Sequence, residues 1–258
     1  MAKTVLFIHG AWLTPDSWNG FMEPFKAAGY ECIAPAWPYM DRPIDQLRNN
    51  PAPELKHLGV SDIVDHYAGI IATLPEQPIL VGHSFGGLVV QRLLDRGLGI
   101  AGVAIDPAPP RGVLAAPAAV VTSLAVLGSW RGWAKVHSMS EKAFRKGFAG
   151  KLTPEQQTHY YRNNIVPAPG RIFFQAAFGA QTGVKFKNPA RPPLFLTAGL
   201  EDKTVPPSMV RSNYKKQTRA GSPTELLELP GFCHFVMVQE GWQTVADKIL
   251  TWLKSTAK

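Results

Sequence analysis

A serine flanked by glycines gives the first indication of chemistry in this sequence. Residues 78–90 read PILVGHSFGGLVV, so that Gly-His-Ser-Phe-Gly interrupts an apolar run. The pattern Gly-x-Ser-x-Gly is typical of a sharp strand-to-helix turn that strains the serine backbone and exposes Oγ at a helix N-terminus. We therefore predict that Ser84 is a nucleophile. The alternative is a turn serine in a phosphate-binding loop, which would need further glycines ahead of the helix.

A serine hydroxyl is a weak nucleophile and needs a base that is itself oriented by an acid. His234 lies five residues beyond the last expected strand, and Asp202 follows the strand expected at 193–197. Both lie at carboxyl ends of strands, the edge at which open α/β sheets place their sites. The expected roles are nucleophile for Ser84, base for His234 and acid for Asp202.

Other residues compete for the acid and base roles. Asp106 ends the expected strand 101–105, and Glu201 is adjacent to Asp202. The remaining histidines lie before or within expected helices or in the middle of the chain: His9, His57, His66, His83, His137 and His159. Cys233 precedes His234, but a buried structural role is commoner for a free cysteine than a thiol mechanism.

Strands and helices alternate along most of the chain. Apolar runs predict strands at 4–8, 31–34, 79–81, 101–105, 193–197 and 225–229. Helical periodicity predicts helices near 17–28, 61–74, 88–94, 207–217 and 236–253. The alternation indicates an α/β fold with a mostly parallel, doubly wound sheet.

The alternation stops between residues 111 and 187, where the pattern is mostly helical, aromatic and basic. This segment holds eleven of the 27 Lys and Arg residues and two of the 19 acidic residues. We interpret it as a helical lid on a core formed by residues 1–110 and 188–258. The residues expected to line a substrate pocket are Trp12, Trp130, Trp133 and Phe173. The positive charge would either steer anionic substrates or form a solvated face.

Composition limits the class of protein. The 258 residues are 45% hydrophobic and 18% charged, as in one large globular α/β domain. No secretory signal and no apolar run of about 18 residues is evident, so we expect a cytoplasmic protein without a membrane span. Cys32 and Cys233 predict neither a disulfide nor a metal site, and the basic residues match no nucleic-acid-binding module.

Four stretches together resemble the α/β-hydrolase fold: HGAW at 9–12, GHSFGG at 82–87, AGLEDKTV at 198–205, and His234 before a final helix. They are most similar to the compact esterase and hydroxynitrile lyase branch. The resemblance implies that the first strand corresponds to the family's third. It also implies an oxyanion hole formed by the amides of Ala11 and Phe85, with Trp12 as the alternative to Ala11, and supporting roles for His9 and His83.

These observations predict a serine hydrolase that cleaves a carboxylic ester through an acyl-enzyme and needs no cofactor or metal. The expected partner is a small-molecule ester with an apolar portion. A lyase of the hydroxynitrile type, using the same triad for another reaction, is one alternative. A ligand-binding protein that retains the fold is another. The sequence predicts no oligomeric state.

Overall fold

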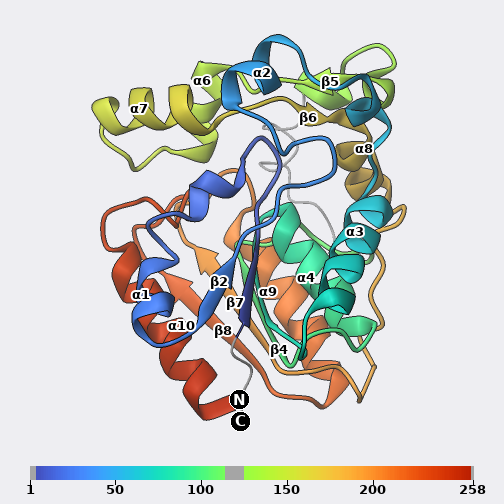
Figure 1. Cartoon of the computed structure of the whole chain (residues 1–258), viewed down its shortest axis with the longest axis vertical. Coiled ribbons are helices and arrows are strands. Elements are labelled where there is room, and N and C mark those ends of the chain that lie inside the picture. The colour runs from blue at the N-terminus through green and yellow to red at the C-terminus, as the bar shows by residue number, and fades with distance from the viewer. Residues whose placement is uncertain (1–3, 114–124, 257–258) are drawn as a thin grey trace.

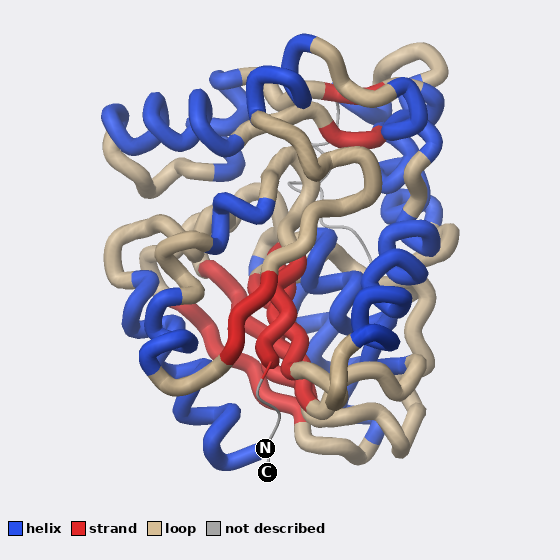
Figure 2. Tube along the Cα trace, viewed as in Figure 1, coloured by secondary structure: helices blue, strands red, loops and turns tan. Residues whose placement is uncertain are grey.

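A computed structural model of the chain describes residues 4–113 and 125–256. At its centre lies a six-stranded sheet in the order β2-β1-β3-β4-β7-β8 (Figures 1 and 2). All five neighbouring pairs are parallel, so the carboxyl ends of the strands meet at one edge. The strands are β1 (Thr4–Ile8), β2 (Glu31–Ile33), β3 (Ile79–His83), β4 (Ala101–Ile105), β7 (Leu194–Gly199) and β8 (Thr224–Leu229).

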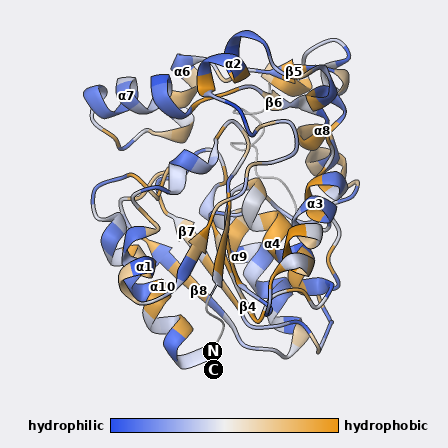
Figure 3. Cartoon of the chain, viewed as in Figure 1, coloured by the Kyte–Doolittle hydropathy of each residue, from blue (hydrophilic) through white to orange (hydrophobic). Residues whose placement is uncertain are grey.

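Burial on both faces explains the composition of the central strands. Every residue of β1, β3, β4 and β7 is buried, and the central sheet is coloured mostly as hydrophobic in Figure 3. Parallel strands covered on both faces are apolar throughout rather than alternating. One face is covered by α1 (Glu23–Ala27) and α10 (Trp242–Thr256), the other by α3 (Val60–Thr73), α4 (Phe85–Asp95) and α9 (Pro207–Gln217). The predicted doubly wound α/β fold is confirmed.

Two expected helices differ most in extent from the observed ones. The expected helix 17–28 is a short 3₁₀ turn, η1 (Pro15–Trp18), followed by α1. Pro24 lies in the first turn of α1, and because proline has no N–H it cannot continue a helix that started earlier. The last helix begins at Trp242 instead of Val236, because residues 231–241 form a tight loop in which Gln239 Oε1 accepts the Cys233 N–H at 2.8 Å.

A second layer lies over the carboxyl edge of the sheet (Figure 1). It contains α2 (Ile44–Asn49), η2 (Pro53–His57), η3 (Gly132–Ala134), β5 (Val136–His137), α6 (Glu141–Ala143), the π-helical turn η4 (Phe144–Phe148), α7 (Pro154–Asn164), β6 (Ala168–Pro169) and α8 (Gly170–Phe178). We call this the cap layer, made of residues 38–58 and 125–178. Of the lid expected at 111–187, residues 114–124 lie outside the described residues.

The earlier of the two cap stretches was not expected from the sequence. Arg48 on α2 joins them, since its Nε donates to the Ile165 carbonyl oxygen at 2.7 Å.

Outside the cap layer, the short helix η5 (Thr218–Ala220) links α9 to β8. Over the described ranges, no helix is both long enough and apolar enough to cross a membrane.

Candidate active site

Ser84 lies on a turn that only small neighbours permit. It follows β3 with φ 54° and ψ −119°, a region that non-glycine residues rarely adopt, and α4 begins at the next residue. A Cβ on Gly82 would lie 2.3 Å from the Gly86 carbonyl oxygen. A Cβ on Gly86 would lie 2.1 Å from the carbonyl oxygen of Ile8 on β1. The two glycines of the motif are therefore required by backbone packing around the serine.

His234 and Asp202 form a buried pair. His234 Nδ1 lies 2.6 Å from Asp202 Oδ2, and both side chains are fully buried. The other carboxylate oxygen, Oδ1, accepts the backbone N–H groups of Thr204 at 2.7 Å and Val205 at 2.8 Å. His234 Nε2 has no partner in the described part of the chain. Burial lowers the pKa of His234 to about 3, so its imidazole is neutral and able to take up a proton at Nε2.

Two further histidines hold the loops around the serine. His83 Nε2 donates to the backbone carbonyl oxygen of His234 at 2.8 Å. His9 Nδ1 donates to the Gly10 carbonyl oxygen at 2.9 Å, and its Nε2 accepts the Trp37 N–H at 3.2 Å. Burial lowers the pKa of His9 to about 4 and that of His83 well below its ordinary value. Both imidazoles are therefore neutral, and their hydrogen bonds hold these loops in place.

The loop after β1 lies directly against Ser84. A Cβ on Gly10 would approach the Ser84 Cβ to 2.9 Å. Ala11 and Phe85, the expected oxyanion-hole residues, are both buried. Neither backbone N–H donates to another residue within 4–113 or 125–256. Phe85 follows the serine directly, Ala11 follows the Gly10 that lies against it, and both amides have spare hydrogen-bonding capacity.

The aromatic residues expected to line a pocket separate into two groups. Trp12 and Phe173 pack together with ring centroids 4.4 Å apart, and Phe173 also contacts Phe85 at 5.2 Å. Trp12 is held by its Nε1, which donates to the His137 carbonyl oxygen at 3.0 Å. In contrast, Trp130 is 83% exposed and Trp133 is 47% exposed. Only Trp12 and Phe173 are brought beside the serine loop.

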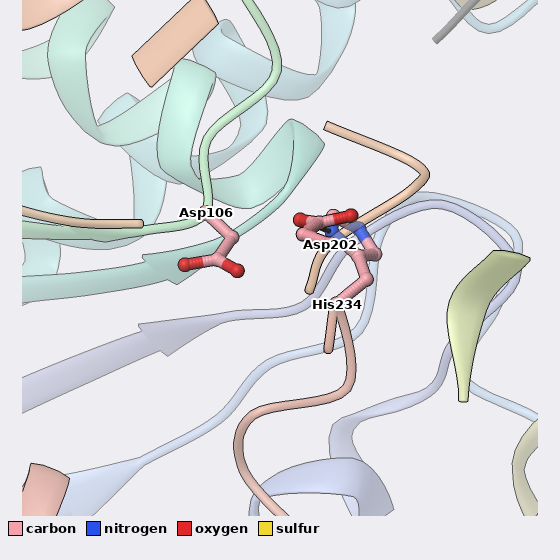
Figure 4. A group of neighbouring side chains, drawn as sticks. All are labelled: Asp106, Asp202 and His234. Atoms are coloured by element: carbon pink, nitrogen blue, oxygen red, sulfur yellow. Dashed lines mark hydrogen bonds and ion pairs between the residues drawn. The ribbon is translucent and has the colours of Figure 1, made fainter. Parts of the chain in front are cut away.

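The two alternative candidates for the catalytic acid, Glu201 and Asp106, lie in different surroundings. Glu201 lies at the surface, with Oε2 3.7 Å from Lys151 Nζ. Asp106 is fully buried beside the Asp202–His234 pair (Figure 4). Cys233 is buried as well, and burial raises the pKa of its thiol to about 11, so it is an unreactive thiol at neutral pH.

Asp106, Asp202 and His234 each bring one potential ligand atom within 4.8 Å of the others. The two carboxyl groups already accept hydrogen bonds, however: Asp106 accepts the Thr197 hydroxyl at 2.8 Å and the Gly199 N–H at 3.1 Å. Asp202 accepts two backbone N–H groups and the Nδ1–H of His234. Carboxyl groups that already accept hydrogen bonds from protein donors fit a hydrogen-bonded acid–base group better than a metal site.

Several site contacts could not be inferred from sequence. The Thr197 and Gly199 contacts to Asp106 join residues more than 90 positions apart, and the bond from His83 to the His234 backbone spans 151 positions. In the sequence, the position of Asp106 at the end of a strand marked it as a candidate acid. Nothing in the sequence marked it as a neighbour of Asp202.

Comparisons with known proteins agree with this geometry. The model of the alpha/beta hydrolase family matches residues 5–248. The monoacylglycerol lipase of Paleococcus ferrophilus is 23% identical, with a TM-score of 0.69 over 99% of this chain and 96% of its own. A methylesterase from Arabidopsis is 15% identical, with a TM-score of 0.72 over 97% and 98% of the two chains.

A mutant of tomato methylketone synthase I is 16% identical, with a TM-score of 0.72 over 99% of both chains. The search of curated proteins found no match. At these identities the solved structures establish a shared fold, and the family model covers nearly the whole chain, as the sequence resemblance predicted. The chain belongs to the alpha/beta hydrolase family.

Proposed function

We propose that the protein hydrolyses carboxylic esters through an acyl-enzyme on Ser84. The observation that carries the proposal is the buried His234–Asp202 pair at 2.6 Å, whose Nε2 atom is unpartnered among the described residues. The pair lies at the same sheet edge as the strained Ser84 turn. Similar structures named as a lipase, a methylesterase and a polyneuridine aldehyde esterase support an ester substrate.

In the first half-reaction, Ser84 Oγ attacks the ester carbonyl carbon while His234 Nε2 takes the hydroxyl proton. Asp202 stabilises the imidazolium that forms. The tetrahedral intermediate collapses, the bond to the alcohol oxygen breaks, and His234 returns the proton to the leaving alcohol. In the second half-reaction, water attacks the acyl-enzyme with His234 again as base, which releases the carboxylic acid and restores Ser84.

The oxyanion of each intermediate needs donors that are in place beforehand, and loss of one donor costs a factor of about 10²–10³ in rate. We assign these donors to the backbone N–H groups of Ala11 and Phe85. The position of Phe85 at the first residue of α4 adds the helix dipole to the second donor. Side-chain substitutions at either residue would leave the amides in place and would not test the assignment.

The apolar part of the substrate is assigned to the aromatic group of Trp12, Phe85 and Phe173. Their contacts at 4.4 and 5.2 Å form a continuous apolar surface beside the serine loop. Aromatic linings of this kind favour apolar acyl or alcohol groups over charged ones.

A panel of p-nitrophenyl esters of increasing acyl length tests the proposal with the wild type, Ser84→Ala and Ser61→Ala. Ser61 lies on α3, where its hydroxyl accepts a hydrogen bond from Arg92. We expect turnover and fluorophosphonate labelling in the wild type and Ser61→Ala, and neither in Ser84→Ala. Absence of turnover on every ester, lactone and thioester would refute the proposal.

The same panel separates ester hydrolysis from the alternative reaction. A similar structure is named a methylketone synthase, so this fold also occurs in a protein named for another activity. Cyanide release from cyanohydrins without ester turnover would favour the hydroxynitrile lyase alternative. Fluorophosphonate labelling alone would not, because both reactions use the same serine.

A further inference from the structure

A third carboxyl group lies beside the Asp202–His234 pair. Asp106 follows β4 with φ 44°, in the left-handed region that non-glycine residues seldom occupy, and is fully buried. It lies beside the Asp202–His234 pair in Figure 4. One carboxyl oxygen of Asp106 and one of Asp202 lie within 4.8 Å of each other, and both side chains are buried. Two buried carboxyl groups this close cannot both be ionised, and because a carboxylate can only accept, a hydrogen bond between them requires a proton on one of the two.

The surrounding donors decide which group holds that proton. Asp202 accepts three N–H groups, from Thr204, Val205 and His234 Nδ1. Asp106 accepts only the Thr197 hydroxyl and the Gly199 N–H. A carboxylate with more donors, and with a base that becomes cationic beside it, is the better place for negative charge. Burial raises the pKa of both groups, but the N–H donors on Asp202 oppose this effect there, whereas the neighbouring Asp202 charge raises the pKa of Asp106 further.

We propose that Asp106 is a positioning residue: a neutral carboxylic acid that donates a hydrogen bond to Asp202 and thereby sets the orientation and proton affinity of His234. This inference rests on the proposed function, in which His234 is the general base. A donor on Asp202 stabilises its charge and makes it a weaker acceptor for the imidazolium. His234 therefore stays neutral, and competent as a base, to a lower pH.

The fold around Asp106 accommodates this role. A Cβ on Gly199 would lie 2.8 Å from Asp106 Oδ2, so only glycine at this position allows the carboxyl group to reach the backbone N–H. Within the described residues, the titratable groups facing Asp106 are Asp202, His234 and Cys233. The Cys233 thiol is neutral because burial raises its pKa to about 11. No cation faces Asp106 in this part of the structure, which favours its neutral form.

The test is the pH dependence of ester turnover in the wild type, Asp106→Asn and Asp106→Leu. Asparagine preserves the shape, donates to Asp202 through its amide N–H, and accepts from Thr197 through its oxygen. We expect the kcat of Asp106→Asn to stay within about threefold of the wild-type value. The acidic limb of its pH–rate profile should lie at the same pH as in the wild type. Leucine of similar volume removes the donor, so kcat should fall about tenfold with KM nearly unchanged. The acidic limb of the profile should move to higher pH by about one unit.

Two results would overturn the proposal. If Asp106 carried a negative charge, Asp106→Asn would remove that charge, lower the pKa of His234, and move the acidic limb downward. If both variants kept the wild-type limb and kcat and only lost stability, Asp106 would be a structural residue without influence on His234.

A second readout does not depend on turnover. The infrared carbonyl stretch of a protonated carboxylic acid should be present at pH 7 in the wild type and in Ser84→Ala, and lost in Asp106→Asn. Absence of that band from the wild type would overturn the proposal. If no ester is hydrolysed, the proposed function fails while this spectrum still reports the proton on Asp106. The Asn variant and the spectrum also complete the test if the Leu variant does not fold.

Discussion

The Nε2 atom of His83 lies 2.8 Å from the backbone carbonyl oxygen of His234. The residue that precedes the proposed nucleophile is thus bonded to the main chain of the proposed base, and their rings are 4.6 Å apart between centroids. A carbonyl can only accept, so this contact fixes the His83 tautomer with its proton on Nε2. The bond ties the loop at 231–241 to the end of β3 and sets where His234 lies relative to Ser84.

Replacing His83 with Phe should therefore reduce both activity and stability. The His234 carbonyl would lose its donor inside the core, at a cost of about 1–3 kcal/mol in the free energy of unfolding. We expect kcat to fall about tenfold, with a smaller change in KM, because the base moves relative to the nucleophile. Urea unfolding and steady-state kinetics measure the two effects. Wild-type values of both would show that the bond has no positioning role.

Gly86→Ala should disrupt the turn that presents Ser84. The added Cβ would lie 2.1 Å from the Ile8 carbonyl oxygen, and both atoms belong to rigid backbone elements. Overpacking of this kind costs about 1–3 kcal/mol or more. The matched control is Gly69→Ala in α3, where a Cβ meets nothing within 4 Å. It should stabilise the protein by about 0.5–1 kcal/mol, since alanine is the better helix former.

Thermal or urea unfolding of the two alanine variants gives the comparison. Opposite signs of the change in unfolding free energy are expected. Equal changes would mean that the close approach of α4 to β1 relaxes at little cost, contrary to the explanation of the glycine motif given above.

The buried histidines predict a loss of stability in acid. His9 and His234 have pKa values lowered by burial to about 4 and about 3, and that of His83 is also well below 6.5. The unfolded chain therefore binds more protons on these groups as the pH falls from 6.5 toward 4. Asp106 and Asp202, whose pKa values burial raises, act in the opposite sense. Three histidines act in one sense and two carboxyl groups in the other, so a net uptake of protons by the unfolded chain remains.

The free energy of unfolding should accordingly rise with pH below about pH 6, where the three histidines of the unfolded chain bind more than two protons, with a slope approaching about 1.4 kcal/mol per pH unit for each net proton. Urea titrations at a series of pH values measure the slope. His9→Asn removes one of the contributing groups and should reduce the slope by about one proton. An unchanged slope in that variant would contradict the assignment of His9 as a buried neutral group.

Arg48 should hold the two stretches of the cap layer together. It donates to the carbonyl oxygens of Ile165 and Tyr161, and its guanidinium lies 5.8 Å from the Tyr161 ring centroid. Loss of these charge-assisted bonds in Arg48→Met, which keeps the aliphatic stem, should lower the free energy of unfolding by about 1–3 kcal/mol. Arg48→Lys should recover only part of this, because lysine lacks the planar fork. A Met variant as stable as the wild type would disprove the link.

The core of the fold was predictable because its signals are local. The apolar runs of β1, β3 and β4 and the Gly-x-Ser-x-Gly turn each depend on neighbours along the chain. Parallel strands then place Ser84, Asp202 and His234 at one edge, and the structure pairs His234 with Asp202 at 2.6 Å. Helix limits were less predictable where a proline or a side-chain bond inside a loop moved them, as at Pro24 and Gln239.

The sequence by itself determined the α/β order, the strained serine turn and the residues that meet at the sheet edge. Only the tertiary structure decided that Asp106 adjoins Asp202, that His83 supports the His234 backbone, and that Trp12 and Phe173 pack beside the serine loop while Trp130 is exposed. The physical reason is sequence separation. Periodicity and turn chemistry report on a residue's near neighbours, whereas contacts between residues about 90 to 160 positions apart depend on the paths of the loops that join the strands.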